Sequence, residues 1–412
     1  MYVNRSLMAK IVLLIFIISF AFPIFSLATD SVFVWSQDDD TSAVSANIET
    51  TTENSTSLNL ECGGAVLIEQ NTGKVLYEHN MHEKLRPASV TKVMTILLIM
   101  EALDSGRITL DTQIPCSENA SSMGGSQIWL DTRETLTVNE MLKAICVVSA
   151  NDCTVAMAEY LAGSEEAFVM QMNEKAKALG MNDTTFKNCH GIDEDGHLTS
   201  AYDISLMSRE LLVNHPSITN YTTIWMDSLR DGKSELVNTN KLIRNYKGAT
   251  GLKTGSTSVA LYNLSASATR DGLSLIAVVM KAPTTKIRFA EATKLLDYGF
   301  NTYSYGEFGK KGDIIKSVSV TKGTLKEVDA VLENSCGALV KKGEEKNLVQ
   351  NVNLEESVQA PVTRGQKLGE VTYSLNEEIV GRSNIVAEKD VSNITLWSMT
   401  GHLFQTWYQL IR

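Results

Sequence analysis

A serine and a lysine three residues apart are the most reactive pair of side chains in the sequence. Ser89 and Lys92 directly precede the apolar run 93–103, and residues three apart at a helix start lie on the same face. A serine hydroxyl becomes a nucleophile when a base takes its proton, and a lysine can be that base once burial and nearby charge lower its pKa. The first turn of a helix also offers free backbone N–H groups to a developing oxyanion. The pair therefore predicts acyl transfer, with Ser89 as the nucleophile and Lys92 as the general base.

The letters Ser-Val-Thr-Lys occur twice, and the surrounding sequence separates the two copies. The second copy starts at Ser319, in alternating apolar and polar sequence, and Gly323 follows it without any helical pattern. The first copy leads into 93–103, which is apolar on nearly every face and so predicts a helix that is buried all round. Such a helix supplies the desolvation that the lysine needs, which favours the copy at Ser89.

A second motif, Ser149-Ala150-Asn151, is predicted to lie in the loop between a helix ending at Val148 and one starting after Cys153. A Ser-x-Asn triplet is a weak signal, because it usually marks a helix cap or a turn. The same pattern begins at residues 45, 57, 117 and 374. Only the copy at Ser149 follows a long apolar helix that could hold a hydroxyl rigidly against the first motif.

The third motif, Lys253-Thr254-Gly255, occurs once and falls on a predicted strand. Its lysine offers a fixed positive charge and its threonine a hydroxyl donor. Its glycine leaves room for a substrate to pair along the strand edge. Taken alone, the triplet could equally be an ordinary strand end. The three motifs in this order are far more specific than any one of them.

The elements that must position these motifs follow from hydrophobic periodicity. A hairpin is predicted around Asn71-Thr72-Gly73, and helical patterns occupy 104–200. Two of these helices have start or stop signals: 141–148 follows a capping box at Thr137–Glu140, and 165–179 ends at Gly180. After about residue 250 the period becomes two, with strands at 252–254, 262–269 and 273–280, a turn at Asp271-Gly272, and a closing amphipathic helix at 285–300. This order predicts a mixed α/β domain over 58–302, whose antiparallel sheet is built from both ends of the segment.

The rest of the chain divides by composition. Residues 1–28 combine two basic residues, an apolar run and small residues before Ala28, which predicts a secretory signal cleaved there; an uncleaved membrane anchor is the alternative. Residues 29–57 are rich in Ser, Thr, Asp and Asn, which predicts a disordered spacer. Residues 303–394 alternate apolar and polar residues between glycine turns and predict a small all-β domain.

Charge and metal-ligand spacing exclude several function classes. A net charge of −11 without a basic cluster argues against nucleic acid and against electrostatic docking on anionic lipid. The six cysteines lack zinc-ligand spacing; Cys146 and Cys153 could be bridged, but buried free thiols are the favoured prediction. The segment from His190 to His197 lacks calcium-loop spacing and a third nearby histidine, so it is predicted to be a surface loop rather than a metal site.

The sequence around the three motifs resembles serine-type D-alanyl-D-alanine carboxypeptidases, the low-molecular-mass penicillin-binding proteins of the penicilloyl serine transferase superfamily. The resemblance covers about 60–395 and includes 87–92, 251–255, 262–269 and the segments 179–181 and 188–191. It implies a serine β-lactamase/transpeptidase-like α/β (α+β) fold followed by a small all-β domain. It also implies an exported enzyme without a cofactor, whose substrates are peptidoglycan stem peptides ending in D-Ala-D-Ala and whose covalent inhibitors are β-lactams.

The resemblance assigns catalytic roles to four residues. Ser89 would form the acyl-enzyme, and Lys92 would be the base for acylation and for deacylation. Ser149 would pass a proton toward the nitrogen of the leaving D-alanine. The backbone N–H groups of Ser89 and Ser256 would form the oxyanion hole.

Substrate binding falls to the remaining motif residues. Asn151 would orient the acyl portion of the substrate, and Lys253 would supply positive charge beside Gly255. Thr254 and Thr257 would hold the terminal carboxylate. Two departures from the family, Ala150 and Leu261, stand where relatives often have glycine; neither position supplies a reacting group, so they bear on rate and selectivity.

Two alternatives use the same residues differently. A class A β-lactamase would need a glutamate followed four residues later by an asparagine to activate the deacylating water. The glutamates between Ser149 and Lys253 lack that partner, since Glu165, Glu166 and Glu174 are followed by Val169, Met170 and Ala178. A non-catalytic wall-binding or penicillin-sensing protein is the other alternative, and the presence of every expected reacting residue disfavours it.

The last stretch, 395–412, has the pattern of an amphipathic helix. Leu396, Met399, Leu403, Trp407 and Leu410 recur at spacings of three and four. Eighteen residues with a polar face cannot span a bilayer, and the aromatic residues suit the headgroup boundary. We expect this helix to lie on the outer face of the membrane; packing on the β domain or on another subunit is the alternative.

Replacing the nucleophile tests the choice between the two Ser-Val-Thr-Lys copies. We expect Ser89→Ala to abolish D-alanine release and covalent penicillin labelling while leaving the fold intact, because the nucleophilic hydroxyl is removed. Ser319→Ala, the matched control, should change neither. Labelled penicillin retained by the Ser89→Ala protein would overturn the assignment.

Overall fold

The computed structural model describes residues 32–33, 58–375 and 377–395. The predicted signal peptide lies outside the described residues, as do all but the first residue of the helix predicted at 395–412 and nearly all of the predicted spacer. Within that spacer, Val32–Phe33 form the short strand β1, which pairs in parallel with β7. No helix among the described residues is long and apolar enough to cross a membrane.

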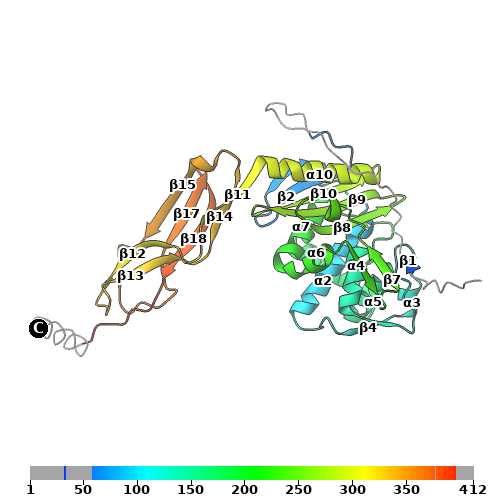
Figure 1. The fold of residues 1–412 in the computed structure, drawn as a ribbon, viewed down its shortest axis with the longest axis horizontal. Helices are drawn as coiled ribbons and strands as arrows, with labels where there is room; N and C mark the ends of the chain where they lie inside the picture. Colours follow the sequence, from blue (N-terminus) through cyan, green and yellow to red (C-terminus); the bar gives the residue numbers. More distant parts are fainter. Residues whose placement is uncertain (1–31, 34–57, 376, 396–412) are drawn as a thin grey trace, which may run out of the picture.

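A five-stranded antiparallel sheet organises the first part of the chain (Figure 1). Its order is β3-β2-β10-β9-β8, so two strands from the start of the segment join three from its end, as predicted. The strands are β2 (Gly64–Glu69), β3 (Val75–His79), β8 (Ala249–Thr257), β9 (Leu261–Arg270) and β10 (Leu273–Ala282). Asp271 and Gly272 both have positive φ, at 49° and 81°. This is the conformation that a two-residue hairpin turn requires.

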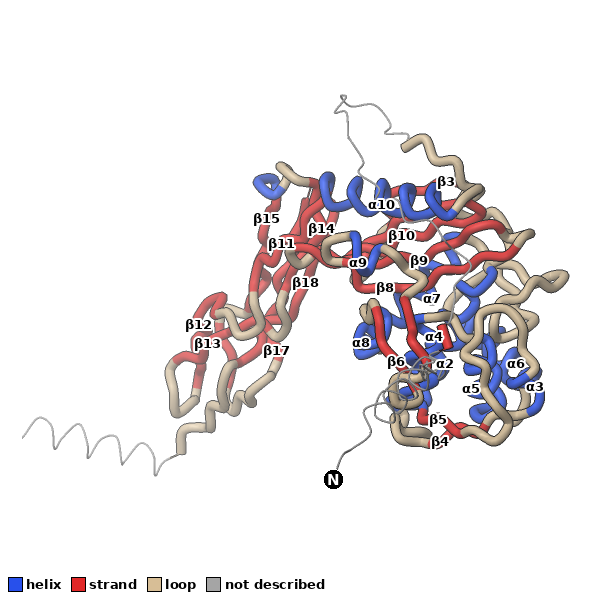
Figure 2. Tube along the Cα trace, turned by 45° about the vertical axis from the view of Figure 1, so that its right-hand side comes forward, coloured by secondary structure: helices blue, strands red, loops and turns tan. Residues whose placement is uncertain are grey.

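Alternating side chains of the sheet enter two separate cores. On β10, Ile276 and Val278 belong to the core shared with the helical insertion, whereas Leu275 and Ala277 belong to the core under α10 (Thr285–Thr302). Both faces of the sheet are therefore covered by helices (Figure 1). The edge strand β8 lies next to the helical side (Figure 2), which places the third motif beside the first two.

The helical insertion supplies the first two motifs. Its main helices are α2 (Lys92–Asp104), α4 (Val138–Val147), α5 (Asn151–Ala162), α6 (Glu165–Ala178) and α7 (Ala201–Asn214). Shorter elements connect them: η1 (Ala88–Thr91), β4 (Gln113–Pro115), α3 (Glu118–Ser121), β5 (Thr135–Thr137), η2 (Pro216–Ile218), α8 (Thr219–Thr222), β6 (Met226–Leu229), β7 (Ser234–Val237) and α9 (Leu242–Asn245). The predicted capping box at Thr137–Glu140 is present. Every residue of α2 from Lys92 to Met100 is buried, which confirms a helix buried all round.

A second region is almost entirely β. A six-stranded sheet, β15-β17-β18-β13-β12-β16, stands beside the pair β11-β14 around its own apolar core. The elements are β11 (Tyr303–Gly309), β12 (Ile314–Thr321), β13 (Glu327–Leu332), β14 (Cys336–Lys341), η3 (Glu345–Asn347), β15 (Leu348–Leu354), β16 (Ser357–Gln359), β17 (Lys367–Leu375) and β18 (Glu378–Ala387). The second Ser-Val-Thr-Lys copy begins on β12, where Ser319 is exposed. It therefore lacks the buried helix that the first copy has.

Candidate active site

Residues from all three motifs line one cavity of about 250 Å³. Seven predicted residues contribute to its wall: Ser89, Ser149, Asn151, Thr254, Gly255, Ser256 and Thr257. The two lysines lie behind this wall. Lys92 and Lys253 are 0% and 1% exposed, and each contacts a residue that lines the cavity. The structure thus brings every predicted site residue together.

Lys92 is the centre of the hydrogen-bond geometry. Its Nζ lies 3.0 Å from Ser89 Oγ, 2.6 Å from Asn151 Oδ1 and 2.7 Å from the carbonyl oxygen of His190. Two of these partners can only accept. A neutral amine donates two N–H bonds and keeps one lone pair, which here faces the serine hydroxyl. The three contacts therefore fit an amine that is ready to take the proton of Ser89.

Burial holds Lys92 near the neutral state. Desolvation and the positive charge of Lys253 lower the pKa of Lys92 well below its ordinary value, as predicted from the sequence. The carboxylate of Asp152 acts in the opposite direction and its effect is weaker. Lys253 thus has an effect on the base in addition to the charge that it offers to a ligand.

Asn151 acts on the lysine as well as lining the cavity. Its Nδ2 donates to the carbonyl oxygen of Gly124 at 2.7 Å, which turns Oδ1 toward Lys92. Its own N–H donates to the carbonyl oxygen of Ser126 at 2.7 Å. The helix α5 begins at Asn151, three residues before the predicted start after Cys153, because Ala150 has the non-helical backbone of a cap residue. This early start fixes Asn151 on the first turn.

Ser89 lies on a tightly wound 3₁₀ turn, η1, rather than in the α-helix itself. Ala88 has a φ of 48°, a strained value for alanine, and Gly191 contacts its carbonyl oxygen. On the other side, a Cβ on Gly255 would lie 2.8 Å from the backbone nitrogen of Ser89 and 2.7 Å from that of Val90. The absence of a side chain at Gly255 therefore also lets β8 approach η1; that it leaves room for a substrate stays a prediction.

Ser149 has an unused hydroxyl. Its backbone φ is 66°, its side chain is 4% exposed, and its Oγ has no hydrogen-bond partner among the described residues. An orphaned buried hydroxyl costs free energy, on the order of 1–3 kcal/mol. Because Ser149 lines the cavity, that cost is removed when a ligand offers a polar atom there.

Thr254 is linked to a residue that the sequence analysis missed. Its Oγ1 donates to Thr239 Oγ1 at 2.7 Å, and Thr239 also lines the cavity. The N–H of Thr239 donates to the carbonyl oxygen of Val147, at the end of α4. Thr239 therefore joins the third motif to the helix that precedes the second. A single threonine between two asparagines gave no signal of this contact.

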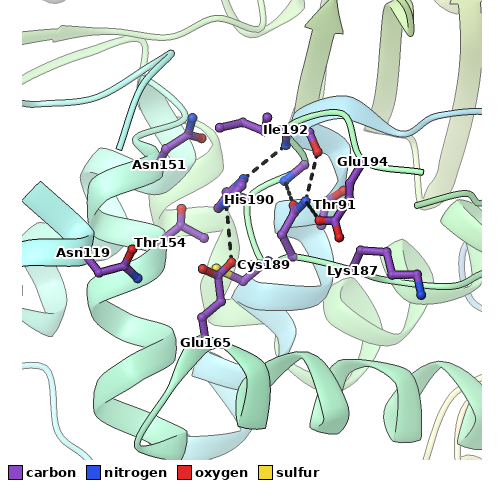
Figure 3. A network of polar contacts seen from close by, with 12 residues as sticks. Thr91, Asn119, Asn151, Thr154, Glu165, Lys187, Cys189, His190, Ile192 and Glu194 are labelled. Carbon is purple, nitrogen blue, oxygen red and sulfur yellow. Dashed lines mark hydrogen bonds and ion pairs between the residues drawn. The ribbon is translucent and has the colours of Figure 1, made fainter. Parts of the chain in front are cut away.

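The segment from His190 to His197 corrects another prediction, because it is not a simple surface loop. His190 and His197 are buried, and Gly191 and Ile192 line the cavity. Burial is the main cause that lowers their pKa values, to about 3 for His190 and about 4 for His197. Figure 3 shows His190 and Ile192 facing the side of Asn151. No metal-binding group of histidine, cysteine and acidic residues occurs within the described ranges.

The cysteines agree with the favoured prediction. All six are free and buried, including Cys146 and Cys153 on either side of the second motif. Burial raises the pKa of the Cys146 thiol to about 12 and that of Cys153 well above its ordinary value. These thiols are protonated at neutral pH and belong to the core.

Fold and site together define a serine acyl-transfer enzyme of the transpeptidase-like class, with a buried lysine beside the serine. The chain belongs to the D-alanyl-D-alanine carboxypeptidase family, whose model matches residues 49–284, more than half of the chain. Residues 303–393 match the model of the penicillin-binding protein 5 C-terminal domain. The predicted fold class, the low-molecular-mass penicillin-binding protein family and the carboxypeptidase activity are thereby confirmed.

Individual relatives agree along most of the chain. The D-alanyl-D-alanine carboxypeptidase DacF of Bacillus subtilis (strain 168) is 46% identical over 335 residues, which cover 80% of this chain and 86% of the relative. The structure of penicillin binding protein 5 from Haemophilus influenzae has a TM-score of 0.68 at 29% identity and covers 82% of this chain and 100% of its own. Penicillin-binding protein D2 from Listeria monocytogenes, in an ampicillin-bound form, has a TM-score of 0.55 at 31% identity and covers 60% of this chain and 100% of its own.

The charge of Lys253 gives a signed pH prediction. A base must be neutral to work, so the rate falls as pH drops through the pKa of Lys92. Lys253→Gln removes the charge that lowers this pKa, so the acid limb of kcat/KM for D-alanine release should move to higher pH. Lys253→Arg keeps the charge and should leave the limb in place. An unmoved limb in Lys253→Gln would contradict the electrostatic coupling.

Proposed function

We propose that the chain releases D-alanine through an acyl-enzyme on Ser89. Lys92 takes the hydroxyl proton while Ser89 Oγ attacks the carbonyl carbon of the penultimate residue. The C–N bond then breaks, and the leaving D-alanine nitrogen receives a proton by way of Ser149. Water, deprotonated by Lys92, attacks the ester and restores the serine. The observation that carries this proposal is the set of three contacts made by Lys92 Nζ. Two acceptors, Asn151 Oδ1 and the His190 carbonyl oxygen, take the N–H groups of a neutral amine, so that its lone pair is directed at Ser89 Oγ.

The developing oxyanion would lie between two backbone N–H groups, those of Ser89 and Ser256. The close approach of Gly255 to the backbone nitrogen of Ser89 supports this proposal, because it brings the two chain segments side by side. Preorganised donors of this kind typically contribute about 10²–10³ in rate. Asn151 would contribute by orienting both the lysine and the acyl portion.

The substrate carboxylate would be held by the hydroxyls of Thr254 and Thr257, with the charge of Lys253 behind them. Thr254 and Thr257 line the cavity from β8, while Lys253 is buried. The carboxylate and amide groups of a peptide ending in D-Ala-D-Ala match these donors. We also propose that β-lactams acylate Ser89, a proposal that the ampicillin-bound form of the Listeria relative supports.

The β-lactamase alternative is disfavoured by the position of its candidate glutamate. Glu165 Oε1 accepts from the N–H of Cys189 at 3.0 Å and lies 3.4 Å from His190 Nε2. These contacts engage the carboxylate outside the cavity, whose lining does not include Glu165. Slow release of the penicilloyl group is therefore expected.

We also propose that the chain works outside the cytoplasm and contacts the membrane. The proposal includes the predicted segment boundaries, which fall after residues 28, 57, 302 and 394. The predicted signal at 1–28 would export the enzyme, and the helix at 395–412 would rest on the outer face of the membrane. The β-rich region would then hold the active site away from the bilayer, toward the peptidoglycan.

A substrate without a free carboxylate tests the role of Thr254. We expect Thr254→Ala to lose activity on a peptide ending in D-Ala-D-Ala, because a hydroxyl donor to the carboxylate is gone. Thr254→Ser should retain most activity. With the terminus amidated, wild type and Thr254→Ala should be equal in kcat/KM. Equal impairment of Thr254→Ala on both peptides would mean that Thr254 has a structural role.

Removing residues 395–412 tests the proposed membrane contact. The truncated, signal-cleaved enzyme should appear in the soluble fraction of lysed cells, because its amphipathic face is gone. D-alanine release from a soluble peptide should stay unchanged and serves as the control for folding. A truncated enzyme that still sediments with membranes would show that this helix is not the anchor.

A further inference from the structure

His190 connects the catalytic lysine to a carboxylate on another helix. Its carbonyl oxygen accepts from Lys92 Nζ at 2.7 Å. Its imidazole Nε2 lies 3.4 Å from Oε1 of Glu165, the first residue of α6. Figure 3 shows Glu165 beneath His190, on the side away from Ile192. A chain of three residues thus runs from α6 to the base.

A hydrogen bond from the main chain fixes the protonation pattern of the ring. The N–H of Ile192 donates to His190 Nδ1 at 3.1 Å, so this nitrogen carries no proton. In the neutral ring the proton is then on Nε2, which faces Glu165. The ring cannot rotate by half a turn without losing both contacts. Glu165 therefore selects one orientation of His190.

Glu165 also holds the peptide unit just before His190. Its Oε1 accepts from the N–H of Cys189 at 3.0 Å, while the carbonyl oxygen of Cys189 accepts from Thr95 Oγ1 at 2.6 Å. The main chain of 189–190 is thus fastened both to α6 and to α2, the helix that carries Lys92. The side chains of Glu165 and His190 are 18% and 8% exposed.

Helix capping alone does not account for this placement. Acidic residues favour the first turn of a helix, and α6 has two of them, Glu165 and Glu166. Glu166 is exposed, and hydrogen bonds with its own backbone N–H and with Ser164 lower its pKa, so it remains at the helix terminus. Glu165 turns instead toward the segment that carries His190. The two neighbours therefore form a matched pair that separates capping from contact with the site.

We propose that Glu165 is a positioning residue for acylation, which holds the His190 carbonyl oxygen on Lys92 Nζ so that the amine's lone pair stays aimed at Ser89. This inference rests on the proposed role of Lys92 as base. With one of its two acceptors displaced, the amine can rotate, and its lone pair no longer faces the hydroxyl. Misplacement of a reacting group by about 1 Å can cost on the order of 10² in rate.

Three single variants of the full chain test the proposal. Glu165→Ala should lower kcat/KM for D-alanine release by about 10-fold or more, because the support of His190 is lost. Glu165→Gln should retain activity within about threefold, since an amide oxygen can accept from both Cys189 N–H and His190 Nε2–H. Glu166→Ala should match wild type in rate. Thermal unfolding of each variant shows whether it is folded.

The pH profile separates positioning from a purely structural role. An ammonium needs three acceptors and loses more than an amine does when the His190 carbonyl oxygen moves away. The pKa of Lys92 should then fall, so the acid limb of Glu165→Ala should lie at lower pH than that of wild type. The other charged groups acting on Lys92, namely Lys253 and Asp152, are unchanged in this variant, whereas the Cys189 thiol loses its contact with Glu165. Glu166→Ala should keep the wild-type limb.

A double variant tests the path through His190. If Glu165 acts through the ring and main chain of His190, Glu165→Ala combined with His190→Ala should be no slower than the slower single variant. The inference would be overturned if the fold-losses in kcat/KM of Glu165→Ala and His190→Ala multiplied in the double variant. It would also be overturned if Glu165→Ala and Glu166→Ala lost kcat/KM equally. An active Lys92→Arg enzyme would instead overturn the proposed base, and this inference with it, because a guanidinium stays protonated.

Discussion

The full burial of Lys92, which the proposed mechanism requires to be neutral, is the constraint on which the rest of the structure depends. Burying an ammonium without compensation is costly, so the fold keeps Lys92 near its amine form by desolvation and by the charge of Lys253. The same burial would leave the amine's N–H groups unpaired if Asn151 Oδ1 and the His190 carbonyl oxygen were absent. Most features of the cavity wall follow from the need to bring these two acceptors to one nitrogen.

The architecture meets this requirement by bringing distant segments together at one sheet edge. Helix α2 is buried on all sides, so it carries Lys92 into the interior without leaving it in contact with solvent. The strand β8 closes the site from the other side, and it can approach η1 because Gly255 has no side chain. The helices on one face and α10 on the other hold the sheet that presents β8. The catalytic geometry is therefore a product of both layers.

Two of the non-glycine residues with positive φ lie at the cavity. Ala88 and Ser149 have φ values of 48° and 66°, and Leu261, at the start of β9, has 56°. Such conformations cost on the order of 1–3 kcal/mol each for residues other than glycine. Both positions at which relatives often have glycine can be compared on this basis. A glycine at position 261 would adopt the backbone conformation of Leu261 without strain. Ala150 has a φ of −56°, which does not require glycine. The strain at Ala88 and Ser149 lies next to or on the reacting groups, where the surrounding contacts hold it in place.

Local sequence alone determined the serine–lysine pair, the buried helix behind it, the hairpins and the capping box, because these depend on neighbours within a few positions. It also separated Ser89 from Ser319, since helix and strand periodicities differ over a short window. The acceptors of Lys92, in contrast, lie 59 and 98 residues away along the chain. Only the tertiary structure made His190 a buried partner of the base and joined Thr239 to Thr254. It also turned Glu165 toward the site while its neighbour Glu166 stayed in solvent. Burial and hydrogen-bond partnership arise between segments that meet only on folding, and periodicity carries no information about which segments meet.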